Sequence, residues 1–176
     1  MVHLYTIGHS TRSIDEFIEI LLAYDITILV DVRSWPSSKR YPHFNQEILS
    51  KKLKEKGIKY EWLGKELGGY RKKGLEDDSP NKAWKSKSFR NYADHAMTEE
   101  FRHDIKKLLE LAEKDRLVVM CAERFYWSCH RRIISDYLLV KSHTITHIID
   151  KDNTREHELT IFAKLIDGNL GYPETP

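Results

Sequence analysis

The segment from residue 121 to residue 132 holds the densest set of side chains that could do chemistry. It combines thiols, a carboxylate, cations and aromatic rings in the order Cys121-Ala122-Glu123-Arg124-Phe125-Tyr126-Trp127-Ser128-Cys129-His130-Arg131-Arg132. Because Ser128 is of a type that caps helices, we expect a helix to begin there. Its first turn would then contain Cys129, His130 and Arg131. Cations at that end oppose the helix dipole, which a bound phosphate or carboxylate would offset. The pattern predicts an anion site; alternatively, the two arginines pair with acids such as Asp136.

The two cysteines allow two interpretations. A thiol in the first turn of a helix has a lowered pKa, so Cys129 could act as a nucleophile. Cys121 ends an apolar run, and we expect it to be a small packed side chain. Neither cysteine belongs to a C-x-x-C or paired-histidine motif, which argues against a zinc site. The sequence therefore predicts no metal and no cofactor.

Two carboxylates, Asp31 and Glu123, lie at or just after the ends of predicted strands. A pair of acids at one edge can serve as a general base and as a stabiliser of a cationic transition state. The alternative is that each pairs with a neighbouring arginine, such as Arg33 or Arg124. His9 follows the first predicted strand and is a candidate proton donor, or it hydrogen-bonds within its loop. We nominate Asp31, Glu123, His9 and Cys129 as candidate catalytic residues.

Aromatic and basic residues are interleaved near the same strand ends. The rings are Trp35, Phe125, Tyr126 and Trp127, of which the three consecutive ones cannot all point inward. Rings beside Arg and Lys are suited to stacking on nucleobases. Residues 63–90 contain 8 basic and 4 acidic residues, a local charge of 8 − 4 = +4 that can attract phosphate. The alternatives are aromatic packing over the core and a solvated surface loop.

Alternating hydrophobic periods indicate the elements that position these residues. Strands are predicted at residues 3–7, 27–32, 58–63, 117–121 and 144–149. Helices are predicted at about 14–22, 45–56, 89–97, 98–112, 128–141 and 156–166, with an irregular basic segment at about 64–88 that we expect to be functional or mobile. This alternation predicts a single α/β domain over residues 1–176, with a mostly parallel, Rossmann-like open sheet and helices on both faces.

In such a sheet, ligands bind beyond the carboxyl ends of the strands. Four consecutive predicted strands end in polar, glycine-rich or aromatic segments, which would meet at one edge. The candidate binding residues there are Ser10, Arg33, Ser34, Trp35, Gly68, Gly69, Tyr126, Trp127, His130 and Arg131.

Composition narrows the class of protein. The chain has 176 residues, of which 40% are hydrophobic and 32% charged, so it is neither disordered nor membranous by composition. The N-terminus lacks the pattern of a signal peptide, and two cysteines argue against a disulfide scaffold. We expect a cytoplasmic protein that does not associate with membranes.

The motifs together resemble one known family. Tyr5-Thr6-Ile7-Gly8-His9-Ser10, Asp31-Val32-Arg33-Ser34 with Pro36 and Ser38, Phe44-Asn45, Leu67-Gly68-Gly69, and Cys121-Ala122-Glu123 with Cys129-His130-Arg131-Arg132 are similar to domain-of-unknown-function family 488, from about residue 3 to residue 150. The resemblance implies a small prokaryotic protein of a widespread family without a settled activity. A weaker similarity is to rhodaneses, through an Asp-Val-Arg at a strand end and a later cysteine, but their six-residue anion cradle closed by arginine is missing.

Three functions remain open from the sequence. The first is an enzyme on a nucleic acid or nucleotide, in which Asp31 or Glu123 activates water against a base–sugar bond. The second is rhodanese-like sulfur transfer or other cysteine chemistry at Cys129 or Cys121. The third is a non-catalytic module that binds nucleic acid.

Overall fold

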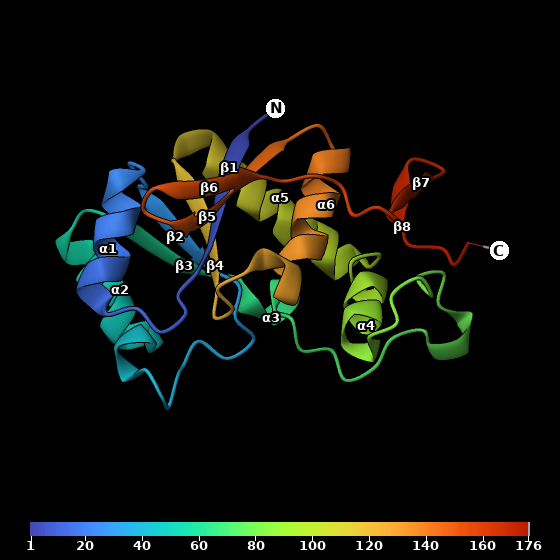
Figure 1. The fold of residues 1–176 in the computed structure, drawn as a ribbon, viewed down its shortest axis with the longest axis horizontal. Coiled ribbons are helices and arrows are strands. Elements are labelled where there is room, and N and C mark those ends of the chain that lie inside the picture. The colour runs from blue at the N-terminus through green and yellow to red at the C-terminus, as the bar shows by residue number, and fades with distance from the viewer. Residues whose placement is uncertain (176) are drawn as a thin grey trace.

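The central element of the computed structural model, which describes residues 1–175, is a six-stranded sheet of order β3-β2-β4-β1-β5-β6 (Figure 1). The strands are β1 His3–Gly8, β2 Ile28–Asp31, β3 Lys59–Trp62, β4 Leu117–Cys121, β5 Thr144–Asp150 and β6 Asn153–Glu156. All pairings except β5 with β6 are parallel. The predicted mostly parallel α/β sheet is confirmed.

Helices cover both faces of this sheet, as predicted. They are α1 Ile14–Ala23, α2 Gln46–Glu55, α3 Gly64–Leu67, α4 Lys87–His95, α5 Glu99–Lys114 and α6 Arg131–Val140. The helices α1 and α2 bury their apolar sides against residues such as Val118 and Met120 on one face. The alternate residues of β4, Val119 and Cys121, face a second core with α4, α5 and α6. The period of two along a strand therefore divides the apolar residues between two cores.

The prediction of a helix at residues 156–166 is wrong. The strand β6 ends at Glu156, turns follow, and β7 Lys164–Ile166 pairs with β8 Asn169–Gly171 as a small hairpin. The apolar residues of this segment have the spacing of a helix. Its conformation depends instead on a distant contact, because the Thr160 amide donates to Asp136 Oδ1 at 3.0 Å. Asp167 and Gly168 both have positive φ, as the tight turn of a two-residue hairpin requires.

The helix α6 begins three residues later than predicted. Residues Tyr126–Ser128 form a 3₁₀ turn, and Cys129 is extended with φ −146°. Ser128 is therefore not the cap of α6. The backbone N–H of Arg131 instead donates to Cys129 Sγ at 3.4 Å, so a sulfur atom satisfies one of the free amides at the start of the helix.

The basic segment at 64–88 is largely irregular, as predicted, but buried contacts hold it in place. Asp94 in α4 accepts hydrogen bonds from the Leu75 amide, the Ser79 hydroxyl and the Asn81 side chain. At the start of the segment, Tyr92 donates its buried hydroxyl to the carbonyl of Leu67 at 2.8 Å. The segment is therefore part of the packed structure around α4. Among residues 1–175, no helix combines the length and apolar character needed to cross a bilayer.

Candidate active site

The carboxyl ends of β1, β2 and β4 meet at one edge of the sheet. Gly8 lies opposite Cys121, and the amide of His9 donates to the Cys121 carbonyl at 2.9 Å. A Cβ atom at Gly8 would lie 1.7 Å from the carbonyl oxygen of Glu123. Glycine at this position therefore allows the segment after β4 to fold back across the end of β1. This close approach brings the two cysteines together.

Cys121 and Cys129 form a buried pair of thiols. Their Sγ atoms are 3.2 Å apart, and both side chains are free of a disulfide. Burial by itself raises the pKa of Cys129, but the hydrogen bond with Cys121 and the positive charge of Arg131 outweigh it and hold that pKa well below its usual value. Burial and the same hydrogen bond raise the pKa of Cys121. The charge of Arg131 and the hydrogen bond with Cys121 thus favour the ionised form of Cys129 over that of Cys121.

Arg131 supplies the positive charge next to this thiolate. Its side chain is buried, and its Nε–H donates to Cys129 Sγ at 3.3 Å. The other end of the guanidinium donates to Thr6 Oγ1 at 3.0 Å and to the carbonyls of Glu123 and Arg124. The sequence predicts an anion near this helix terminus with Arg131 as its partner. In the structure, the sulfur of Cys129 occupies that position.

The histidine beside Cys129 lines a cavity. His130 donates its Nε2–H to the carbonyl oxygen of Val32, 3.2 Å away, and burial lowers the pKa of His130. A cavity of about 280 Å³ is lined by Gly69, Tyr70, Ser88, Phe89, Tyr92, Ser128, Cys129 and His130. A Cβ atom at Gly69 would lie 2.5 Å from His130 Nδ1, so glycine leaves room for the imidazole. Three of the predicted site residues, Gly69, Cys129 and His130, therefore share one cavity of small-molecule size.

Asp31 and Arg33 form a buried ion pair. The guanidinium of Arg33 donates to Asp31 Oδ1 at 2.9 Å and to Oδ2 at 2.7 Å, and Tyr60 donates its hydroxyl to Oδ2 at 2.6 Å. Asp31 is fully buried. His9 lies 3.5 Å from the guanidinium of Arg33, and burial lowers the pKa of His9 to about 4. Between a general base and an ion-pair partner, the geometry of Asp31 is that of an ion-pair partner of Arg33. His9, with its lowered pKa, is neutral at pH 7.

The other predicted catalytic carboxylate is exposed. Glu123 lies in the segment after β4, where its backbone carbonyl, not its side chain, holds Arg131. Ser10 has a positive φ of 54° and donates its amide to the carbonyl of Ala122. Glu123 and Asp31 are therefore in different environments, one facing solvent and one in the interior.

The aromatic residues divide between the interior and the surface. Tyr126 stacks on the buried ring of His147, with ring centroids 3.6 Å apart. Phe125 and Trp127 stack on each other at 4.6 Å on the outside, and Arg155 lies over the Trp127 ring. The expectation that these rings cannot all point inward is confirmed.

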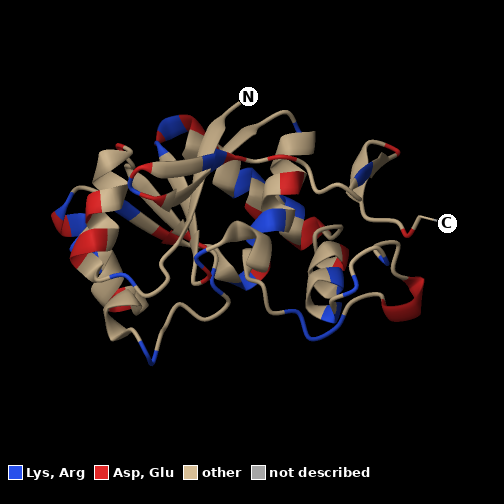
Figure 2. Ribbon diagram, in the orientation of Figure 1, with Lys and Arg blue, Asp and Glu red and all other residues tan. Residues whose placement is uncertain are grey.

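A second aromatic pair stands beside basic loops. Trp35 is 63% exposed and its ring lies 5.0 Å from that of Tyr70. The Ser34 hydroxyl accepts a hydrogen bond from the Tyr70 amide. A Cβ atom at Gly68 would lie 2.4 Å from that hydroxyl, so glycine leaves room for this bond. Figure 2 shows Lys and Arg residues on the loop between β2 and α2 and on the loop between α3 and α4.

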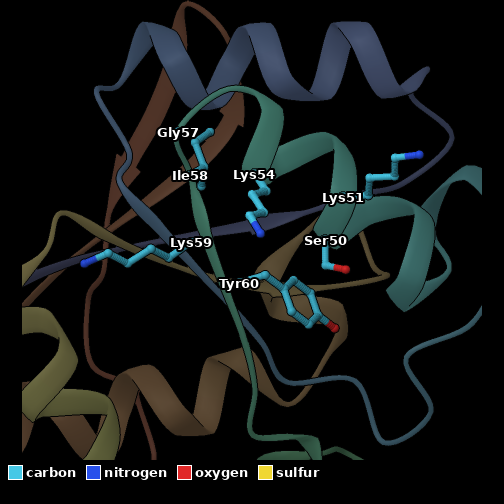
Figure 3. Close-up of a pocket in the computed structure, with 7 residues that line it drawn as sticks. All are labelled: Ser50, Lys51, Lys54, Gly57, Ile58, Lys59 and Tyr60. Carbon is cyan, nitrogen blue, oxygen red and sulfur yellow. The ribbon is translucent and has the colours of Figure 1, made fainter.

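A larger cavity, of about 640 Å³, contains none of the predicted site residues. It lies along the outer strand β3 and is lined by Ser50, Lys51, Lys54, Gly57, Ile58, Lys59 and Tyr60. Figure 3 shows Lys51 and Lys59 pointing in opposite directions, and Lys59 is paired with Asp115 at 3.1 Å. These lysines do not converge on one point as an anion site requires. The part of the chain that the structure describes also contains no cluster of three or more His, Cys, Asp or Glu side chains suited to a metal ion.

Sequence reasoning missed two residues that build the site: Thr6 supports Arg131, and Tyr92 lines the cavity. Cys121, expected as a packed side chain and named as an alternative to Cys129 for cysteine chemistry, lies beside Cys129. The resemblance motifs contain Thr6 and Cys121, but their roles depend on contacts between distant strands.

Comparison with known proteins places the chain in a family. Residues 13–138 match the family model described as Domain of unknown function DUF488. A search of curated proteins and a search of solved structures gave no match. The match spans well over half of the chain and includes α1, β2, β4 and most of α6. The chain therefore belongs to the domain of unknown function family DUF488.

Proposed function

We propose that the protein carries out thiol–disulfide exchange, with Cys129 as the nucleophile and Cys121 as the resolving thiol. One observation carries the proposal: Cys129 Sγ lies 3.2 Å from Cys121 Sγ and 3.3 Å from Arg131 Nε, at the wall of a cavity. A thiolate is the reactive form of cysteine, and a positive charge next to it favours that form at neutral pH. Cys129 lines the cavity, so a small substrate bound there would lie next to this residue.

The exchange has two steps. In the first, the Cys129 thiolate attacks one sulfur of a small disulfide R–S–S–R′, forms a mixed disulfide and releases R′S⁻. In the second, the Cys121 thiol gives its proton to the released thiolate, attacks Cys129 Sγ and releases the other half of the substrate as a thiol after protonation by solvent. The substrate disulfide is reduced to two thiols, and the protein dithiol is oxidised to an internal disulfide. A low-molecular-weight dithiol reductant would restore the starting state.

The neighbouring thiol favours this reaction over rhodanese-like sulfur transfer. A sulfur-transfer enzyme must hold a persulfide on its cysteine until an acceptor arrives. Here Cys121 lies next to Cys129, so it would attack such a persulfide and expel its outer sulfur as sulfide. The pairing therefore supports a cycle between dithiol and disulfide.

Intact-mass analysis after incubation with hydroxyethyl disulfide tests the proposal. The wild-type protein is expected to lose the mass of two hydrogen atoms as the internal disulfide forms. Cys121→Ser is expected to retain a mixed disulfide on Cys129, and Cys129→Ser is expected to react far more slowly. The sequence has two cysteines, so each mass change has a defined origin. An unmodified wild-type protein, or faster reaction at Cys121 than at Cys129, would contradict thiol exchange. Incubation with thiosulfate tests rhodanese-like sulfur transfer, which would add the mass of one sulfur atom to the protein.

Action on a nucleic acid or nucleotide is our second candidate function. The exposed, stacked pair of Phe125 and Trp127 with Arg155 over the ring supports it, because such surfaces bind unstacked bases. The exposed Glu123 would be the candidate base for hydrolysis of a base–sugar bond, since Asp31 is enclosed by its ion pair. Without hydrolysis, the same surface would make the protein a binding module.

Fluorescence anisotropy with a short labelled single-stranded oligonucleotide tests this second candidate. Trp127→Ala is expected to weaken salt-sensitive binding by about tenfold, as the loss of one stacked base does. The control Ile161→Ala removes an exposed apolar side chain elsewhere and is expected to leave binding unchanged. Product formation lost in Glu123→Gln would assign hydrolysis. Absence of oligonucleotide binding in the wild type would remove this candidate and leave thiol exchange unaffected.

A further inference from the structure

A chain of hydrogen-bonded side chains leads from Arg131 across β1 and β5 to His157, just after β6, and ends at Asp136 in α6. Thr6 Oγ1 and His147 Nδ1 are 2.6 Å apart, His147 Nε2 and His157 Nδ1 are 2.9 Å apart, and His157 Nε2 lies 2.8 Å from Asp136 Oδ1. All four side chains are buried. Buried titratable groups at this density serve a purpose that packing alone does not explain, because apolar residues of the same size would stabilise the core as well.

The chemistry of the two ends fixes the direction of the hydrogen bonds at those ends. A guanidinium can only donate, so Arg131 donates to Thr6 Oγ1 at 3.0 Å. A carboxylate can only accept, so His157 donates its Nε2–H to Asp136. With His147 neutral, one arrangement that satisfies the partners has the Thr6 hydroxyl donating to His147 Nδ1 and His147 Nε2–H donating to His157 Nδ1. The path then leads from the cation of Arg131 to the carboxylate of Asp136.

The surroundings support these charge states. Burial, followed by the nearby His157, Arg131 and Arg155, lowers the pKa of His147 to about 2, so His147 is neutral. Further hydrogen bonds reach Asp136 Oδ1 from the Thr160 amide at 3.0 Å and Oδ2 from the Tyr172 hydroxyl at 2.7 Å. The ring of Tyr126 covers His147. The carboxylate is thus held from three sides and anchors the whole path.

We propose that Thr6, His147, His157 and Asp136 are positioning residues that hold the Arg131 guanidinium against Cys129. This inference rests on the proposed function, because it concerns the reactivity of the same thiolate. The link is Thr6, whose hydroxyl oxygen accepts from Arg131 while the opposite edge of the guanidinium contacts Cys129 Sγ. Without that acceptor, Nη1 of the guanidinium loses its hydrogen-bond partner, and only Cys129 and the carbonyls of Glu123 and Arg124 hold the group in place.

Other groups also face Cys129. They are Cys121 from β4, Tyr92 from α4, and His130 from its own segment, with Arg71 of the 64–88 segment close to Tyr92 and His130. Burial raises the pKa of Tyr92 and lowers that of His130, so both are neutral at pH 7. The tests below leave all four of these residues unchanged.

Substitution of Thr6 provides a matched pair of variants. Thr6→Val keeps the shape and removes the hydroxyl, whereas Thr6→Ser keeps the hydroxyl. We expect Thr6→Val to raise the apparent pKa of Cys129 by about one unit, measured as a shift of the pH profile of alkylation by iodoacetamide toward higher pH. Thr6→Ser is expected to restore the wild-type pH profile, as an intact acceptor for Arg131 predicts.

A second variant acts further along the path. His147→Gln breaks the connection to His157 and is expected to raise the apparent pKa of Cys129 in the same direction. The control His3→Gln removes a hydrogen bond to Thr146, which joins the same two strands outside the path. It is expected to leave the pH profile unchanged. A purely structural role would lower the melting temperature of the variants without moving the pKa of Cys129.

The outcomes separate this inference from the proposed function. Wild-type Cys129 that titrates as an ordinary thiol would contradict the proposed function, and with it the positioning role of these four residues. A low pKa of Cys129 that persists in folded Thr6→Val and His147→Gln would contradict the positioning role alone.

Discussion

Replacing Arg131 by methionine is expected to slow alkylation of Cys129 at pH 7 by about tenfold. Loss of an adjacent opposite charge raises a thiol pKa by about 1–3 units, and a thiol of ordinary pKa is only about 3% ionised at this pH. The remaining thiolate is intrinsically more nucleophilic, which offsets part of the loss. The rate of iodoacetamide labelling as a function of pH measures both the apparent pKa and the limiting rate.

Arg131→Lys is the matched variant for this experiment. Lysine keeps the charge but cannot contact Cys129 and Thr6 at once with a planar fork, so we expect an intermediate pKa. Circular dichroism establishes that each variant is folded before its rates are compared. Equal pH profiles for wild type and folded Arg131→Met would show that the guanidinium does not stabilise the thiolate.

Asp31→Asn is expected to destabilise the protein by about 3–5 kcal/mol, because it leaves a buried guanidinium without its anion. Asp31 accepts hydrogen bonds from Arg33 and from Tyr60 and is fully buried. For a chain of this size, the loss corresponds to a decrease in Tm of about 10 °C. Thermal unfolding followed by circular dichroism measures it.

A surface ion pair serves as the control for Asp31. Glu99→Gln removes a partner of Arg102 in an exposed pair along α5, and its effect on Tm is expected to be negligible. The comparison also separates the two roles considered for Asp31. A folded Asp31→Asn protein of unchanged Tm that lost a measured activity would favour a catalytic role over a structural one.

The strands and helices of the α/β layer could be predicted because the residues of each element indicate that element without contacts from distant parts of the chain. The apolar β-branched run of β2 and the helical spacing after Ser13 each specify one element, and Ser13 caps α1 by accepting the Glu16 amide. The segment after β6 could not be predicted in this way. Its apolar spacing fits a helix, but its conformation depends on hydrogen bonds from Thr160 to Asp136, which lies 24 residues away in the chain.

In the candidate site, too, some residues could be predicted from local sequence and others depend on contacts between distant parts of the chain. Cys129 and Arg131 could be nominated because they follow a predicted strand, where ligands bind in this type of sheet. The path of positioning residues could not be predicted, because Thr6 and His147 become neighbours only when β1 pairs with β5 in the register that places them opposite each other. Likewise, burial and the hydrogen bond with Cys129 raise the pKa of Cys121, and that contact forms only when the chain after β4 folds back toward the end of β1.

The most direct test of this account is a titration of thiolate ultraviolet absorbance in the wild-type protein, with Cys129→Ser and Cys121→Ser as references. The account predicts that one thiolate is present at pH 7, that it disappears in Cys129→Ser, and that it is lost only at acidic pH. The second thiol is expected to ionise only at strongly alkaline pH, because burial and its bond to Cys129 raise the pKa of Cys121. Thiolate absorbance that appears only near the ordinary pKa of a free cysteine, for both thiols, would contradict the account.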